Sequence, residues 1–383
     1  MRNIYLDHAA STPVHPEVAA EMLRVMQGQY GNASSIHAFG RAAKRTVNGA
    51  RDSLAASLGC RPDEVVFTAG GTESDNLALF GSVATSHTEG KHIITTAVEH
   101  HAVLHSCHEL EKRGYHVTYL PVDSQGMVYA DQVKEAITDD TILISVMYAN
   151  NEVGTVQPIQ EIGTLARERG IVFHVDAVQA LGSLDISCSD LPVDLMSFSA
   201  HKINGPQGIG ALYVQHNTRL EPLLHGGLQE RKRRAGTENL AGAAGFARAA
   251  QLATADIPAK QAYDEGLRRT FLTALDQHIG KDRYVINGHP TSRLAHILNI
   301  SFPEVGTETM LMNLDMEGIA AASGSACTSG SLEPSHVLEA MNIPEQVLRS
   351  AIRFSFGLGN TNEEMEYTAE KIGTILSRIR NRR

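Results

Sequence analysis

The chain has 383 residues, 42% of them hydrophobic and 20% charged, which is enough to bury the cores of two ordinary globular domains. Its formal net charge of −10 argues against direct nucleic-acid binding, because phosphate recognition needs a basic footprint. No run approaches the roughly 18 apolar residues of a membrane helix, and residues 1–13 do not resemble a signal peptide. The four cysteines lack CxxC spacing, which is typical of reduced thiols. We therefore expect a cytoplasmic protein that binds neither a membrane nor, directly, nucleic acid.

Short apolar runs alternate with helical stretches through the first half of the chain. They predict strands near residues 64–70, 91–98, 116–122, 141–149, 171–177, 195–200 and 209–214. Such alternation is typical of an α/β fold with a mostly parallel sheet. Only residues 201–208 separate the last two runs, which is too short for a helical crossover. We therefore expect the final run to form an antiparallel edge strand.

The second half of the chain has a different pattern. Residues 238–275 are polar and alanine-rich and predict consecutive helices that lead to a second domain. The apolar runs that follow are compatible with a small α+β unit. We expect a large cofactor-binding domain over 13–256 and a small domain over 257–383 together with 1–12.

An aspartate and a lysine follow two of the predicted buried strands. Asp176 ends the run IVFHVDA, and Lys202 ends DLMSFSAHK. The carboxyl ends of parallel strands hold ligands in open α/β sheets. Pyridoxal phosphate chemistry needs a lysine amine to condense with the cofactor aldehyde and a carboxylate to keep the pyridine nitrogen protonated. Taken singly, each residue is better explained as a solvated side chain, but together they favour such a cofactor site.

A glycine pair lies between a predicted strand and a predicted helix. Gly70, Gly71 and Thr72 would place backbone N–H groups and a helix dipole where they can bind a phosphate. Ser199 and His201 would add a hydroxyl and an imidazole donor beside them. The simpler alternative is a helix that Thr72 caps.

The stretch AVEHHAVLHSCH is rich in histidine. His101, His105 and His108 would share one helix face, and with Cys107 they could hold zinc, although no HExxH or CxxC motif accompanies them. The alternative is that His100, directly after a strand, stacks on a cofactor ring and moves protons.

Three further polar residues could contact the cofactor or its substrate. Asn151 follows a strand, and Gln179 lies one helical turn beyond the aspartate, so its amide could reach the phenolic oxygen of the cofactor. Either could equally stabilise a turn or a cap. Arg353 alternates with the aromatic residues of RFSFG and could bind a carboxylate with two hydrogen bonds, or it could form a surface salt bridge.

One cysteine has unusual neighbours. Cys327 lies in ASGSACTSGSLEPSH, a polar loop that would expose its thiol, although an incidental loop thiol is the alternative. The remaining cysteines are better explained as small buried or half-buried apolar residues: Cys60, Cys107 and Cys188.

These motifs resemble cysteine desulfurases of the NifS/IscS type, which are fold type I pyridoxal-phosphate enzymes related to class-V aminotransferases. The resemblance runs nearly end to end and rests on YLDHAASTP, YGNASSIHAFG, FTAGGTESDN, VEHHAV, ANNEVGTVQPI, HVDAVQALG, SFSAHKINGPQGIG, RRAGTEN, SGSACTSGSLEPSH and RFSFG. It implies a seven-stranded, mostly parallel sheet in the large domain, a small α+β domain, and a homodimer.

The resemblance also implies how the cofactor is held. Lys202 would bind it covalently, Asp176 would pair with its pyridine nitrogen, and Gln179 would reach its phenolic oxygen. His100 would stack on the ring. The remaining cofactor contacts would come from Gly71, Thr72, Asn151, Ser199 and His201, and from Thr237 in RAGTEN, which would reach the cofactor of the other subunit.

For the reaction, the resemblance implies that Asn151 and Arg353 hold the carboxylate of L-cysteine and that Cys327 is the nucleophile. Cys327 would become a persulfide while the substrate leaves as L-alanine, and the loop resembles that of the group with a long catalytic loop. The sulfur would pass to an iron–sulfur scaffold or to a tRNA-thiolating enzyme. No resident metal is expected, beyond a transient contact of Cys327 with an iron–sulfur centre. The alternatives are a selenocysteine or cysteine lyase, which would not need Cys327, and a non-catalytic sulfur carrier.

Overall fold

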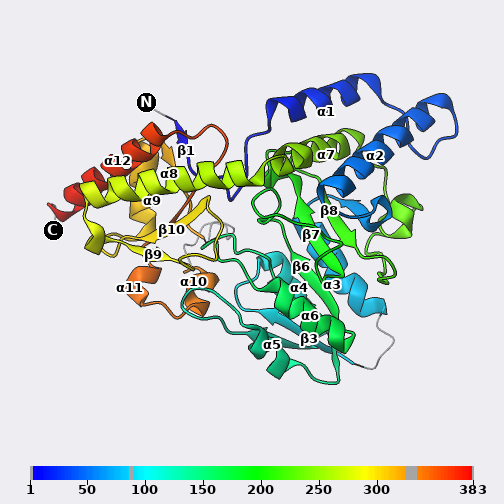
Figure 1. The fold of residues 1–383 in the computed structure, drawn as a ribbon, viewed down its shortest axis with the longest axis horizontal. Coiled ribbons are helices and arrows are strands. Elements are labelled where there is room, and N and C mark those ends of the chain that lie inside the picture. Colours follow the sequence, from blue (N-terminus) through cyan, green and yellow to red (C-terminus); the bar gives the residue numbers. More distant parts are fainter. Residues whose placement is uncertain (1–2, 86–89, 325–333, 382–383) are drawn as a thin grey trace.

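The computed structural model describes residues 3–85, 90–324 and 334–381. Figure 1 shows two layered regions joined by the long helix α8 (Ile257–His278), with the larger sheet on one side and the smaller sheets on the other. Helix α7 (Leu240–Thr254) directly precedes α8, which confirms the consecutive helices predicted over 238–275. In the described ranges, no helix combines the length and apolar character that crossing a membrane requires.

The larger sheet contains seven strands within the described residues, in the order β2-β8-β7-β6-β5-β3-β4. Its strands are β2 (Val65–Thr68), β3 (His92–Thr96), β4 (His116–Leu120), β5 (Thr141–Ser145), β6 (Val172–Asp176), β7 (Leu195–Ser199) and β8 (Gly210–Val214). The pairs from β4 through β7 are parallel, which confirms the predicted α/β fold with a mostly parallel sheet.

One prediction about this sheet is wrong. Strand β8 is antiparallel to β7, as the short connection requires, but it is not an edge strand. The earlier strand β2 pairs antiparallel with its other side, so β2 and β4 form the edges. Strand β8 is buried along its whole length, and its second partner, β2, lies much earlier in the sequence.

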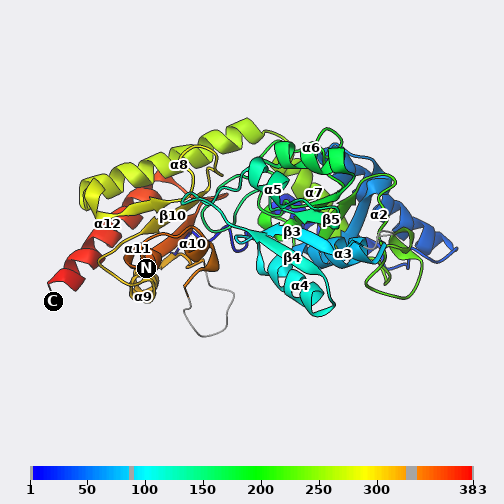
Figure 2. The same ribbon diagram turned by 90° about the horizontal axis from the view of Figure 1, so that it is seen from below.

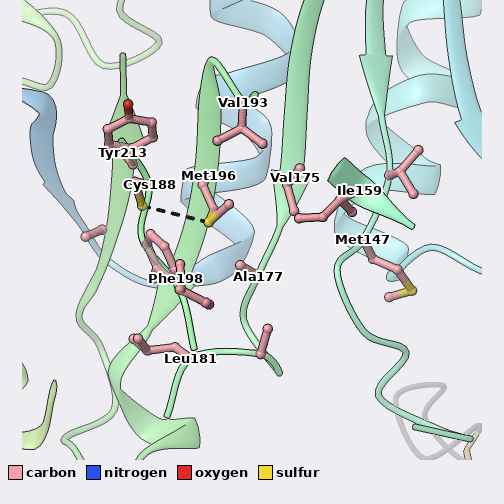
Figure 3. Close-up of a cluster of buried hydrophobic side chains, with 14 of the residues drawn as sticks. Met147, Ile159, Val175, Ala177, Leu181, Cys188, Val193, Met196, Phe198 and Tyr213 are labelled. Carbon is pink, nitrogen blue, oxygen red and sulfur yellow. Dashed lines mark hydrogen bonds between the residues drawn. The ribbon is translucent and has the colours of Figure 1, made fainter. Parts of the chain in front are cut away.

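Helices cover both faces of the larger sheet, because successive strand residues point to opposite sides and both sides are apolar. Figure 3 shows one of these cores, where Val175, Met196 and Phe198 of neighbouring strands pack against Leu181 and Ile159. A fully buried side chain of this size contributes about 1.5–3 kcal/mol to stability. The other helices of this region are α1 (Pro16–Gly28), α2 (Ala38–Ser57), α3 (Gly71–Thr85), α4 (His101–Lys112), α5 (Ala130–Ala136) and α6 (Ile159–Arg169).

The smaller region is built on two short sheets. Strands β9 (Val285–Asn287), β10 (Ile297–Ser301) and β12 (Ala351–Ser355) are antiparallel, and β1 (Ile4–Tyr5) pairs with β11 (Ile319–Ala320). Phe354 and Phe356 pack against Phe271 of α8 with ring centroids 5.1 and 6.2 Å apart, so the alternation predicted around Arg353 is confirmed. The remaining helices are α9 (Thr307–Met316), α10 (His336–Ala340), α11 (Glu345–Leu348) and α12 (Asn362–Arg380).

The segment 4–12 crosses between the two regions. Its first part belongs to the smaller one, where the Leu6 carbonyl accepts a hydrogen bond from the Ser355 N–H at 2.8 Å. Its last part reaches the larger sheet, where the Thr12 N–H donates to the His201 carbonyl at 2.9 Å. The intervening residues therefore lie at the junction, directly beside the ends of β6 and β7.

Candidate active site

A cavity of about 280 Å³ lies beyond the carboxyl ends of β5, β6 and β7, where parallel strands of this architecture hold ligands. Residues from the segment 4–12, the larger sheet and β12 line it together. Among its lining residues are most of those predicted from the sequence: Gly71, Thr72, His100, Asn151, Asp176, Gln179, Ser199, His201, Lys202 and Arg353.

The aspartate and the lysine face this cavity from neighbouring strands. Asp176, the last residue of β6, is only 6% exposed, and its Oδ1 accepts a hydrogen bond from the Val178 N–H at 3.0 Å. Burial raises the pKa of Asp176 to about 6. Lys202 ends the short turn Ala200–Lys202 after β7, and its Nζ donates to the Ala9 and Ala10 carbonyls at 2.5 and 2.9 Å.

The burial of Asp176 predicts a pH-dependent gain in stability for Asp176→Asn in the cofactor-free protein. Between pH 3.8 and about 6 the folded chain keeps a proton that the unfolded chain has lost, so stability falls as pH rises through this window. Asparagine avoids this ionisation and still accepts from Val178. The variant should be more stable by roughly 2–3 kcal/mol at pH 7.5 and about equally stable below pH 4.

Urea unfolding at several pH values measures this difference. The exposed Asp190 provides a matched control, since Asp190→Asn should change stability little over the same range. A gain for Asp176→Asn that does not depend on pH would contradict the assignment of the raised pKa to this carboxyl group.

A buried polar layer, which sequence reasoning missed, lies behind Asp176. His174 bonds to the hydroxyls of Ser145 and Ser197 at 2.8 and 3.0 Å, and its Nε2 lies 3.6 Å from a carboxylate oxygen of Asp75. Burial lowers the pKa of His174 to about 3 and, with the charge of Asp176, raises the pKa of Asp75 well above its ordinary value. His174 is therefore neutral at pH 7, and burial disfavours the ionised form of the Asp75 carboxyl group.

His100 is the N-cap of α4 and lines the cavity. Its Nδ1 accepts the Ala102 N–H at 3.1 Å, so the neutral ring carries its proton on Nε2. Burial and the nearby Lys202 lower the pKa of His100 to about 4. The preceding Glu99, also missed from the sequence, is fully buried, and burial raises its pKa to about 8.

The glycine turn lines an open cup at the N-terminus of α3, where backbone N–H groups would suit an anion. Gly70 has a φ of 154°, and α3 begins at Gly71, where a Cβ would lie 2.7 Å from a methyl group of Val178. Thr72 therefore belongs to the first turn and is not the cap. The buried Ser199 hydroxyl, which also lines the cup, has no hydrogen-bond partner among the described residues. A phosphate at this helix N-terminus would give it one.

Arg353 is buried, at 4% exposed, and does not form the surface salt bridge considered from the sequence. Its guanidinium donates to Asp7 Oδ1 at 2.8 Å and to the Asn151 carbonyl at 3.0 Å, while its buried Nε bonds to no described residue. Gln179 Nε2 donates to the Ala9 carbonyl at 2.8 Å. The segment 4–12 thus contacts four polar side chains of the site, since Ser11 Oγ also lies 3.4 Å from His201 Nδ1. Sequence reasoning missed this role.

Two predicted residues are not part of this cavity as described. Thr237 is exposed and does not line the cavity of its own subunit. Cys327 lies outside the described residues.

The other histidines and cysteines lie outside this cavity, with His101 half-buried and His105 and His108 exposed on α4. His101, His105 and His108 follow one another on α4 with ring centroids 5.1 and 6.2 Å apart. No three His, Cys, Asp or Glu side chains are placed to hold a metal in the part of the chain that the structure describes, so these rings do not support the zinc alternative. Cys107 and Cys188 are buried in apolar clusters.

Comparison with known proteins places this geometry in context. The class-V aminotransferase model matches residues 4–368. The chain is 48% identical over 382 residues to the cysteine desulfurase IscS of Methanosarcina thermophila, covering 99% of this chain and 93% of that protein. It is 49% identical to the putative cysteine desulfurase IscS 1 of Bacillus subtilis, with coverage of 99% and 100%. A solved NifS-like protein superposes with a TM-score of 0.92 at 36% identity, over 98% of this chain and 100% of the other.

The described residues fit pyridoxal phosphate. The buried Asp176 carboxylate suits the pyridinium, the Lys202 amine faces the same cavity, and the Ser199 hydroxyl, which has no partner among the described residues, suits the phosphate. Gly71 keeps the approach to the phosphate cup free of a side chain.

Proposed function

The chain belongs to the class-V aminotransferase family and is a pyridoxal-phosphate-dependent cysteine desulfurase, and we propose that it transfers the sulfur of L-cysteine to Cys327 and releases L-alanine. The family predicted from the sequence motifs is therefore confirmed. One observation supports the residue assignment most directly: the Lys202 amine, the buried Asp176 carboxylate, the unpartnered Ser199 hydroxyl and the Arg353 guanidinium converge on one cavity.

In this proposal the bound cofactor supplies an electron sink for the α-carbon of the substrate. Asp176 would keep the pyridine nitrogen protonated. The positive charge of the pyridinium would in turn stabilise the ionised carboxylate, which burial alone disfavours. Lys202 Nζ would leave the Ala9 and Ala10 carbonyls to hold the cofactor, and the released amine would take the α-proton. Gln179 would donate to the phenolic oxygen, and His100 would lie against the ring with Nε2 available for proton exchange.

Arg353 would bind the substrate carboxylate through its unpartnered Nε, with the Asn151 side chain beside it. Asp7 and the Asn151 carbonyl fix the plane of the guanidinium, so less rotational freedom is lost when the substrate binds.

Cys327 would then attack the sulfur of the substrate as a thiolate. A sulfur–sulfur bond forms, the carbon–sulfur bond breaks, and its electron pair stays on carbon, which takes up a proton to give L-alanine. The persulfide on Cys327 would pass to an acceptor protein, either an iron–sulfur scaffold or a tRNA-thiolating enzyme. The described cysteines are free thiols, which supports a reducing compartment such as the cytoplasm.

The chain would act as a homodimer, with Thr237 reaching the cofactor of the partner subunit. Figures 1 and 2 both show α1 and α2 at the end of the molecule opposite α12. Large apolar side chains on and near these helices, and on the segment before Thr237, are exposed: Leu23, Met26, Tyr30, Ile36, Phe39, Leu223, Leu224 and Leu228. A second copy of the chain would cover them.

The backbone shortly before Thr237 is held in one unusual conformation. Glu230, Arg231 and Lys232 have φ values of 44°, 55° and 68°, a conformation that side chains other than glycine rarely adopt. Buried hydrogen bonds from Arg51 to both carboxylate oxygens of Glu230, at 2.7 and 2.6 Å, hold this backbone in place. We also propose that 13–256 and 257–383 with 1–12 are the two domains, because the smaller core draws on Ile4 and Leu6.

A single turnover with L-cysteine tests the proposal. Mass spectrometry of the intact chain and of the peptide containing Cys327 should show one added sulfur, matched by an equal amount of L-alanine. Alanine or pyruvate without the sulfur adduct would instead indicate a lyase that releases sulfur directly.

A further inference from the structure

A second cavity, of about 310 Å³, lies at the junction of the larger and smaller regions. Its walls include the start of α8, the turn after β7, the residues that follow β12 and part of the segment 4–12. His8 and Thr12 line it, whereas Ala9 and Ala10, which lie between them in the sequence, line the candidate active site. Of the described residues, Lys202 alone lines both cavities. The second cavity is therefore a neighbour of the active site, and the proposed function makes no use of it.

One part of this cavity wall is apolar. Leu181, Ile203 and Leu252 line it from the larger region, and Phe356 and Leu358 line it from the smaller region. Pockets for small molecules typically measure about 300–1,000 Å³ and combine an apolar wall with a few placed polar groups. The size and this part of the lining therefore suit a small molecule that has an apolar portion.

Two buried residues of the wall each have a polar atom without a hydrogen-bond partner among the described residues. They are Asp264 of α8, through Oδ1, and His296, directly before β10, through Nδ1. Asp264 is only 2% exposed and His296 only 8%, so bulk water does not satisfy these atoms. Buried polar atoms are rarely left unpaired, because they have lost their hydrogen bonds to water. A bound molecule with polar groups would supply the missing partners.

The charged groups of the cavity are balanced. Lys260 and Asp264, one turn apart on α8, form an ion pair in which Nζ lies 2.6 Å from Oδ2. Burial and the charge of Lys260 hold the pKa of His296 well below its ordinary value, so this ring is neutral at pH 7. A ligand with only a negative charge would meet the Asp264 carboxylate, and one with only a positive charge would meet the Lys260 ammonium. No three metal-ligating side chains in the described ranges are placed to hold an ion. The cavity therefore suits a ligand that carries both charges.

We propose that this second cavity binds a free α-amino acid with an apolar side chain. Such a molecule carries its ammonium and carboxylate groups on the same carbon atom, so the two charges can pair with the adjacent Asp264 Oδ1 and Lys260 Nζ. Lys260 has further N–H groups to donate, since an ammonium carries three. His296 Nδ1 offers another hydrogen bond to the charged end of the ligand. The apolar side chain packs against Leu181 and Leu252.

Calorimetric titration of the cofactor-loaded enzyme with L-leucine tests this site. Two analogues each lack one of the charged groups: isocaproic acid has no ammonium group, and isoamylamine has no carboxylate. Both should bind at least about tenfold more weakly than L-leucine, because each leaves one member of the Lys260–Asp264 pair without its partner on the ligand. The absorbance of the cofactor, recorded in parallel, reports any leucine that reacts in the active site.

Two variants change the cavity in different ways. Asp264→Asn keeps the shape of the side chain but removes the charge that pairs with the ligand's ammonium, so L-leucine should bind at least about tenfold more weakly. Ala253→Leu, at a half-buried position of the wall, occupies the space without changing a charge and should abolish measurable binding. Glu265→Gln is the matched control, because it removes a charge from the next residue of α8, which pairs with Arg293 and does not line the cavity. This variant should bind L-leucine as the wild type does.

Nuclear magnetic resonance of the enzyme labelled with ¹⁵N-histidine locates the bound molecule. The ring signals of His296 should shift when L-leucine is added, since His296 lines the cavity. The ring signals of His105 and His108, which are exposed on α4, should stay in place. In Asp264→Asn the shift of the His296 signals should appear only at a correspondingly higher concentration of L-leucine.

Three results would overturn this inference. Unchanged leucine binding in both Asp264→Asn and Ala253→Leu would place the ligand elsewhere. Equal binding of L-leucine and its two analogues would show that the cavity does not recognise both charges. No binding of L-leucine to the wild-type enzyme would show that water alone fills the cavity. None of these measurements depends on sulfur transfer, so they test the second cavity separately from the proposed function.

Discussion

Replacing Lys202 with alanine should abolish the visible absorption band of lysine-bound cofactor and lower cysteine turnover by at least about 10³-fold. The side chain is the amine beside Asp176 in the cavity, and its Nζ is already held there by the Ala9 and Ala10 carbonyls. The variant loses both the covalent attachment and the proposed base for the α-proton, and these losses act on the same step.

Absorbance spectra and alanine production of the cofactor-loaded variant measure the two effects. Lys134→Ala, on the exposed side of α5, is the control and should keep both properties. Retention of the band in the Lys202 variant would refute the assignment. A lost band with normal turnover would exclude Lys202 as the base while keeping it as the attachment point.

Replacing Cys327 with alanine should lower alanine and sulfide formation by at least about 10²-fold while the cofactor band and its response to L-cysteine persist. The two buried thiols, those of Cys107 and Cys188, are not suited to replace it. Burial raises the pKa of Cys107 to about 12, and contact with Cys60 together with burial raises the pKa of Cys188 well above its ordinary value. Few thiolates form at such positions near pH 7.

Sulfide release with a physiological acceptor and alanine formation should be measured together for this variant. Cys60→Ala, at a half-buried position, is the matched control and should react normally. Unchanged sulfide release in Cys327→Ala would remove the nucleophile from the proposal and favour a lyase. An equal loss in Cys60→Ala would show that the effect is not specific to residue 327.

Most strands of the larger sheet were predictable because they are buried on both faces and so appear as continuous apolar runs. Their order was only partly predictable, since the position of β8 depends on its pairing with β2, and no local pattern encodes which distant strand completes a sheet. The helical stretch that includes α8 was predicted from composition alone, because alanine and alternating polar residues favour helix over strand.

The candidate site was predictable where residues lie at or shortly after the carboxyl ends of strands, as Asp176, Lys202 and His100 do. The acids Asp75 and Glu99 were missed, because aspartate and glutamate are ordinarily solvated and nothing in their immediate sequence indicates burial. The contacts of Asp7 with Arg353 and of Ala9 with Lys202 join residues 346 and 193 positions apart, and such long-range contacts are visible only in the fold.

The placement of residues 4–12 also has a consequence for biosynthesis. A ribosome makes this segment long before its partners Ile319 and Arg353. Until those residues emerge, β1 has no strand to join and Asp7 has no guanidinium to orient. A chain that stops before β12 therefore carries Lys202 but lacks Arg353 and the contacts that align it.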